Sequence, residues 1–179
     1  MNYKDLIINI IDAFKTKHIG FGKTRLIKIA YLTELEFFRR KRERLTDANW
    51  IYYKYGPYPQ NYQDYLEHRL IEIEDKDEAG FQPIKIKEYG KIPEIPDEIK
   101  RIINHLIEQY GKIDLNKLLD YVYYDTEPMM NVEKRGEYLN FDTVLPNEYY
   151  KINKFDNTEK AQKSIKRKYK DRIKNARKL

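Results

Sequence analysis

The sequence of 179 residues contains no cysteine, a single tryptophan, and seven residues each of glycine and proline. Without cysteine the chain cannot form a disulfide, bind zinc or an iron–sulfur cluster through sulfur, or use a thiol nucleophile. Long apolar runs are missing as well: none approaches the roughly 20 residues of a membrane helix, and the N-terminus lacks a signal-peptide pattern. We therefore expect a soluble, cytoplasmic protein that makes no contact with a membrane.

Recognisable catalytic and cofactor-binding patterns are also missing. The three histidines, His18, His68 and His105, are isolated from one another and from any second residue at metal-ligand spacing. Residues 20–24 (GFGKT) end like a phosphate-binding loop but lack its first glycine. Arg101 and His105 are too close in sequence for the arginine–histidine pair of an RNase. We expect no enzyme activity, no cofactor and no metal ion.

Positive charge is concentrated at one end of the chain. The net charge is +6, from 35 Lys and Arg against 29 Asp and Glu. Residues 158–179 hold ten of the basic residues and two of the acidic ones, which gives them a charge of +8. The rest of the chain, with 25 basic and 27 acidic residues, carries −2. This division predicts a near-neutral domain over residues 1–150 and a basic arm over residues 151–179.

The arm has a pattern of its own. Ala161, Ile165, Tyr169, Ile173 and Ala176 fall on one stripe at helical spacing, with Lys and Arg on the other faces. The pattern is typical of a basic amphipathic helix, or of a disordered arm that becomes helical on binding. Basic residues of this kind can contact DNA phosphates, and the candidates are Lys166, Arg167, Lys168, Lys170, Arg172 and Lys174.

Hydrophobic periodicity predicts several helices in the domain. Apolar residues recur every three or four positions, and asparagine, aspartate or glycine stands near the expected ends. The second helix is apolar around most of its circumference, which indicates a central place in the core. The predicted helices cover residues 3–17, 24–44, 60–70, 99–110 and 114–122, and a further one starts at Thr126.

Three segments favour β-structure. Residues 49–55 (NWIYYKY) are aromatic and β-prone, and residues 56–59 (GPYP) read as a rigid turn. Residues 70–74 and 83–87 alternate apolar and polar side chains, which predicts a hairpin with a polar tip. We also expect one strand near residues 138–141. The order is similar to a winged-helix arrangement followed by a helical extension, so the fold class is α+β with a helical majority.

Tyrosine is abundant, with 17 residues. Its large ring and hydroxyl suit a protein-binding face or a stacking platform for single-stranded nucleic acid, and they suit a tyrosine-rich core equally well. Strand alternation sends only one of Tyr52 and Tyr53 outward. The candidates for contact with a protein partner are Tyr52, Tyr53, Tyr58, Tyr62 and Tyr65.

Two blocks of sequence resemble the SocA-like, or Panacea, antitoxin domain family over residues 2–143. The first block is a K-x-x-Y helix followed by an aromatic strand that ends in Gly-Pro, and the second is a Thr-x-Pro helix start. Many members of the family have tryptophan after that proline, whereas this chain has Met129. The residues that match the motifs, and that we expect to act structurally, are Lys28, Tyr31, Trp50, Gly56, Pro57, Thr126 and Pro128.

The resemblance implies a non-enzymatic antitoxin that neutralises a cognate toxin by direct protein–protein binding. One relative of this kind acts instead as an adaptor that delivers its toxin to a protease. The alternative is a winged-helix-like DNA-binding regulator of its own operon. The basic arm favours this alternative, whereas the near-zero charge of the domain disfavours a basic recognition face.

Overall fold

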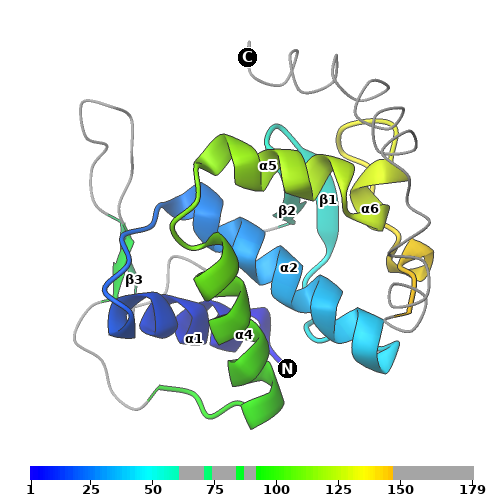
Figure 1. Ribbon diagram of the computed structural model, residues 1–179. Helices are drawn as coiled ribbons and strands as arrows, with labels where there is room; N and C mark the ends of the chain where they lie inside the picture. The colour runs from blue at the N-terminus through cyan, green and yellow to red at the C-terminus, as the bar shows by residue number, and fades with distance from the viewer. Residues whose placement is uncertain (61–70, 74–83, 87–91, 147–179) are drawn as a thin grey trace.

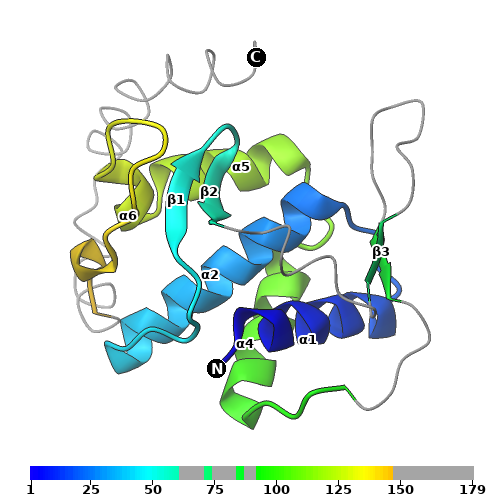
Figure 2. The ribbon, with the colours of Figure 1, turned by 180° about the vertical axis from the view of Figure 1, so that it is seen from behind.

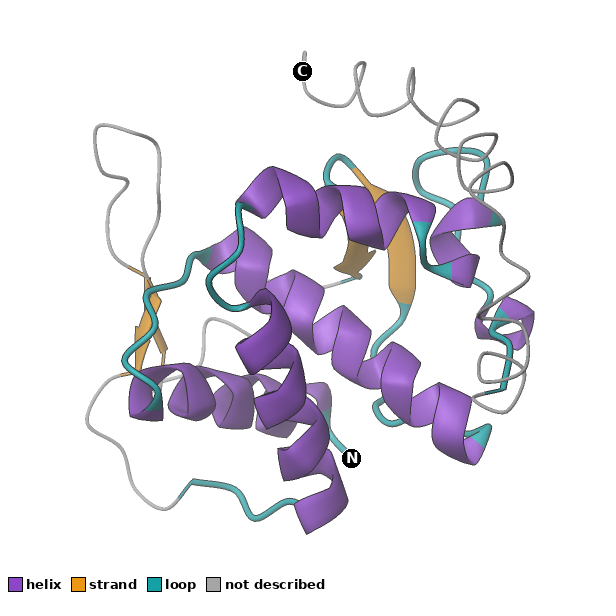
Figure 3. Ribbon diagram, in the orientation of Figure 1, coloured by secondary structure: helices purple, strands orange, loops and turns teal. Residues whose placement is uncertain are grey.

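The computed structural model describes residues 1–60, 71–73, 84–86 and 92–146, and their architecture is mainly helical α+β, as predicted (Figures 1 and 3). The elements follow in the order α1 (Tyr3–Thr16), α2 (Lys23–Lys41), β1 (Trp50–Tyr53), β2 (Gly56–Pro59), β3 (Ile71–Ile73), β4 (Ile84–Ile86), α4 (Asp97–Tyr110), α5 (Leu115–Tyr124) and α6 (Glu127–Met130). A 3₁₀ helix, η1, covers Phe141–Thr143.

Helix α2 lies at the centre of the fold, as its apolar circumference predicts. It contacts α1, α4, α5 and β2. Figures 1 and 2 together show α4 on one side of it and the β1–β2 hairpin on the other. Leu26, Ile29, Ala30 and Leu35 are buried on its different faces. A central helix of this kind links the packing of these four elements to its own position.

The helix boundaries agree closely with the periodicity, with one difference at the end of α2. The predicted end at residue 44 is wrong by three residues, because Arg42 takes a left-handed conformation (φ 60°) and its N–H bonds Phe38 O. Beyond it, the buried carboxylate of Glu34 accepts the N–H of Leu45 at 2.9 Å. The chain therefore turns back along α2 instead of extending it.

The capping residues of α1 and α5 satisfy the first backbone donors. Asn2 accepts from Lys4 N at 2.8 Å, and Asp114, predicted as a cap, accepts from Asn116 N at 2.9 Å. Gly111 ends α4 as expected, although its φ of −65° is that of an ordinary helical residue. The left-handed conformation that glycine permits is thus not used there.

The predicted turn at residues 56–59 is instead a strand. β2 pairs antiparallel with β1, with Trp50 opposite Pro59 and Tyr53 opposite Gly56, so the turn itself lies at Lys54 and Tyr55. A third segment joins on the other side of β1, through Tyr52 N to Glu137 O (2.9 Å) and Leu139 N to Trp50 O (2.8 Å). The strand expected near residues 138–141 is therefore a single bridge, after which the chain enters η1.

The predicted hairpin of residues 70–74 and 83–87 is confirmed by the antiparallel pair β3–β4, with Glu72 opposite Lys85. Its tip lies outside the described residues. So do residues 61–70 of the helix predicted at 60–70, on which the winged-helix comparison depends, and the whole of the basic arm. Among the described helices, none has the length and apolar character needed to cross a membrane.

Candidate protein-binding site

The family-motif residues meet on the inner side of the β1–β2 hairpin, against α2. The ammonium group of Lys28 donates to Pro57 O at 2.8 Å, and both partners are buried. Burial lowers the pKa of Lys28 to about 7. Because the described structure gives this ammonium a single hydrogen-bond partner, the contact ties β2 to the second turn of α2.

The two prolines of β2 block further strand pairing along the edge of β2 that lies away from β1. In the register of the hairpin, Pro57 stands opposite Tyr52 and Pro59 opposite Trp50. The backbone groups of Tyr52 and Trp50 form their hydrogen bonds with residues 136–139 on the other side of β1, and not with β2. The prolines therefore face away from β1, on the edge toward α2, where they offer no N–H. Lys28 satisfies the carbonyl of Pro57 on that edge. The edge is thus unavailable for pairing with another strand.

Gly56 is required by both conformation and space. Its φ is +91°, a region that favours glycine. A Cβ atom at this position would lie 3.4 Å from the ring of Tyr123 and 3.6 Å from Lys28 Nζ. The Tyr123 hydroxyl donates to Lys54 O at 3.3 Å, so the same ring also fixes the turn. The expectation that Gly56 and Pro57 act structurally agrees with this geometry.

The remaining motif residues form a second buried contact, between α2 and the start of α6. The Tyr31 hydroxyl donates to Thr126 Oγ1 at 3.1 Å, and that hydroxyl donates to Val122 O at 2.5 Å. Burial raises the pKa of Tyr31. Pro128 stands in the first turn of α6, where a missing N–H costs nothing, and Met129 is buried.

Trp50 connects these contacts to the core. It is 1% exposed, which confirms the expectation that it is a core residue. Its ring meets those of Tyr31 and Tyr3 edge-on, with centroids 5.4 and 5.6 Å apart. Edge-to-face pairs of this kind stabilise the packing beyond the area that they bury.

A buried ion pair lies near α6. Arg39 Nη2 is 2.7 Å from Glu127 Oε2, and both side chains are almost fully buried. The other oxygen, Oε1, accepts the N–H of Leu145 at 3.2 Å. The pair joins positions 88 residues apart in the sequence, so no local spacing could have indicated it.

The five candidate tyrosines have different positions. Tyr52 is 3% exposed and packs edge-on against Tyr123, so its ring is not available to a partner, and that prediction is corrected. Tyr53, the next residue, is 52% exposed, and Tyr58 is half-buried with its ring 5.2 Å from that of Tyr53. Tyr62 and Tyr65 lie outside the described residues. Contact of Tyr53 and Tyr58 with a partner stays a prediction.

Sequence reasoning missed a further tyrosine on the same surface. Tyr138 bridges to Ile51, which also stands opposite Tyr58, so these three side chains form one row across the sheet. Tyr138 is 62% exposed, and its hydroxyl donates to Gln60 Oε1 at 2.9 Å. We call Tyr53, Tyr58 and Tyr138 the tyrosine face. Only the pairing of distant segments, which periodicity does not reveal, brings its third member there.

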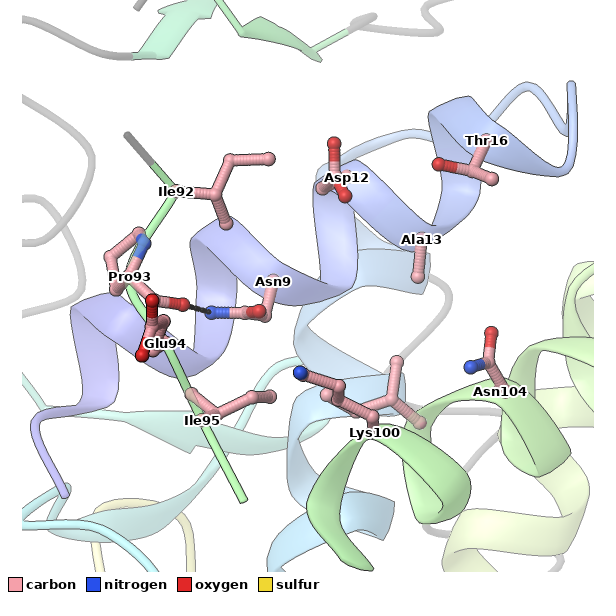
Figure 4. A pocket seen from close by; sticks show the side chains of 11 residues that line it. Asn9, Asp12, Ala13, Thr16, Ile92, Pro93, Glu94, Ile95, Lys100 and Asn104 are labelled. Carbon is pink, nitrogen blue, oxygen red and sulfur yellow. Dashed lines mark hydrogen bonds between the residues drawn. The ribbon is translucent and has the colours of Figure 1, made fainter. Parts of the chain in front are cut away.

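A cavity of about 360 Å³ lies elsewhere, between α1, α4 and the segment before α4 (Figure 4). The Asn9 amide reaches across to Pro93 O at 3.0 Å, and Lys100 and Asn104 come from α4. None of the motif residues lines it. Within the described part of the chain, no three His, Asp or Glu side chains gather where they could hold a metal ion.

Comparison with known proteins identifies a family over the segment that contains these buried contacts. The family model described as antitoxin SocA-like, Panacea domain, matches residues 26–128. These residues run from the first turn of α2 to Pro128 in α6. No curated protein and no solved structure matches the chain. Because the matched segment is more than half of the sequence, the chain belongs to the SocA-like antitoxin family with a Panacea domain.

Proposed function

We propose that this chain neutralises a cognate toxin protein by binding to it directly, without catalysing a reaction. Membership of an antitoxin family over residues 26–128 carries the proposal. The division of the motif region supports it: the motif side chains are used in buried contacts, while tyrosine rings lie exposed on the other side of the same strands. Such rings are well suited to protein contacts, because they bury much area at a small entropic cost.

The test is co-expression with the protein encoded by the neighbouring gene, because toxin and antitoxin genes are expected to be paired. If that protein stops growth when expressed alone, the present chain should restore growth and co-purify with it. Continued growth arrest, together with failure to co-purify, contradicts the proposal.

Direct binding is distinguished from catalysis by stoichiometry. A neutralising partner should abolish toxin activity in vitro at about one equivalent per toxin-binding site and have little effect at one-hundredth of that amount. Full neutralisation at the low ratio would indicate a catalytic antitoxin and contradict this part of the proposal.

DNA binding by the arm is a second proposal, which only the charge of residues 158–179 supports. A promoter fragment should then bind the full chain more weakly as salt increases, and truncation of residues 158–179 should remove that binding. Unchanged binding after truncation contradicts the assignment to the arm.

A further inference from the structure

Exposed aromatic rings gather at one place on the described surface. Tyr53, Tyr55 and Tyr138 are 52%, 43% and 62% exposed, and they include every tyrosine among the large hydrophobic side chains that the described structure leaves exposed. Tyr55 lies in the β1–β2 turn, and the other two belong to the tyrosine face. Aromatic side chains that are exposed in the free protein and buried in a complex often contribute much of the binding energy of a protein interface.

Three cations surround the same end of the sheet. Lys54 lies in the β1–β2 turn, and Lys134 and Arg135 lie in the turn that leads into Tyr138. The two turns are adjacent, because Gly136 N donates to Tyr52 O at 2.8 Å, and Figure 2 shows the second turn beside the end of β1. We call these three residues the cationic rim.

The cationic rim is only partly balanced by the two exposed acidic residues of the second turn, Glu133 and Glu137. Within the described residues, none of its three side chains has a carboxylate at ion-pairing distance. Lys54 instead places its ammonium 5.5 Å from the centre of the Tyr55 ring. The domain has a slight negative charge, whereas the two turns together hold three cations against two carboxylates, so the small excess of positive charge here is local.

The geometry points to the tyrosine face, with Tyr55 and the cationic rim, as the surface that binds the toxin, through a toxin segment that combines acidic with apolar side chains. This inference rests on the proposed function and adds to it the surface and the chemistry of the partner. The charge of the rim complements carboxylates, and the rings provide apolar contact between them. The exposed carboxylates of Glu133 and Glu137 stand in the same turn and disfavour a nucleic-acid strand, whose charge is continuous.

Three variants of the full chain test the inference against the neighbouring gene's protein. The first is Tyr53→Thr with Tyr138→Thr, which removes both rings and introduces a residue that suits extended backbone, and its control is the corresponding pair of Phe substitutions. The second reverses the rim, with Lys54→Glu, Lys134→Glu and Arg135→Glu. The third is a matched reversal away from the sheet, with Arg101→Glu, Lys112→Glu and Lys117→Glu, all exposed in α4, α5 or the link between them.

Binding is measured by calorimetry at low and high salt, after thermal unfolding has shown that each variant folds. We expect the Thr pair to raise Kd about 10-fold or more, and the Phe pair to bind like the wild type. The rim reversal should raise Kd by about 10-fold at low salt and reduce the salt dependence, whereas the matched reversal should leave both unchanged.

Two outcomes overturn the inference in different ways. If the wild type binds and both surface variants bind equally well, the surface is wrong while direct binding stands. If the wild type does not bind, the proposed function fails and this inference fails with it. A labelled oligothymidylate provides a third readout: if it binds the wild type and loses that binding on rim reversal, while toxin binding persists, the surface is a nucleic-acid site and the inference is overturned.

Discussion

The two sides of the β1–β2 hairpin use the same residue types for opposite purposes. On the inner side, Tyr52 and Trp50 are almost completely buried and Lys28 is held against Pro57. On the outer side, Tyr53 and its neighbours on the tyrosine face are exposed. Strand alternation alone separates adjacent tyrosines into these roles. The comparison shows that the motif residues lie on the inner side, in buried contacts, while the outer side exposes the surface proposed for partner binding.

The largest effect is expected from the inner side. Trp50→Ala removes the ring that meets Tyr3 and Tyr31, and it should lower the free energy of unfolding by about 3–5 kcal/mol. Chemical denaturation measures this loss. A loss below about 1 kcal/mol would contradict the central place given to this ring.

The pH dependence of stability sharpens the comparison at Lys28. Its pKa is lowered to about 7 in the folded chain and is near 10.4 when unfolded, so the unfolded state binds more protons between these values. Stability should therefore rise with pH, by on the order of 2–3 kcal/mol from pH 7 to 9.5. Denaturation at the two pH values measures the increase, and Lys28→Met should abolish it. An equal increase in the variant would assign the effect to other groups.

A smaller effect is expected at Gly56. Gly56→Ala forces a side chain into a φ of +91° and brings a Cβ atom to 3.4 Å from Tyr123, which should cost about 1–3 kcal/mol. Gly20→Ala is the matched control, because its Cβ would meet no atom within 4 Å. Thermal unfolding compares the two variants. Equal melting temperatures would show that the hairpin tolerates a side chain at Gly56.

The smallest effect on stability is expected on the outer side. Tyr53→Thr should change the free energy of unfolding by no more than about 0.5 kcal/mol, because its ring is half exposed and threonine suits a strand. Denaturation of Tyr53→Thr beside Tyr52→Thr tests the contrast directly. The two sides would not be functionally separate if Tyr53→Thr destabilised the chain as much as the variant of its buried neighbour.

Much of the helical framework could be predicted from local patterns. Periodicity predicts α1, α2, α4 and α5, and the sequence also indicates Asp114 as the N-cap of α5. β2 was not predicted, because two prolines in four residues are typical of a turn. They are tolerated in this strand only because they face α2 and not β1. That information exists only after the hairpin has packed on the helix.

The proposed binding surface was predicted less completely, for the same reason. Alternation left open which of Tyr52 and Tyr53 is buried, and the packing of Tyr123 decides it. Tyr138 and the Arg39–Glu127 pair depend on contacts between segments far apart in the sequence. The structural role expected for Gly56 and Pro57 agrees with the geometry, since a fixed φ and a positive φ are local requirements that a sequence can indicate.

Hydrogen–deuterium exchange of the chain, alone and in complex with its toxin, tests the central claim most directly. The Tyr138 amide faces away from β1, because the bonds on either side of it come from Glu137 and Leu139. The account predicts that peptides covering residues 53–58 and 134–139 exchange more slowly in the complex, while those of α4 are unchanged. Protection confined to α4 or to other parts of the chain, with exchange in these two segments unaltered, would contradict it.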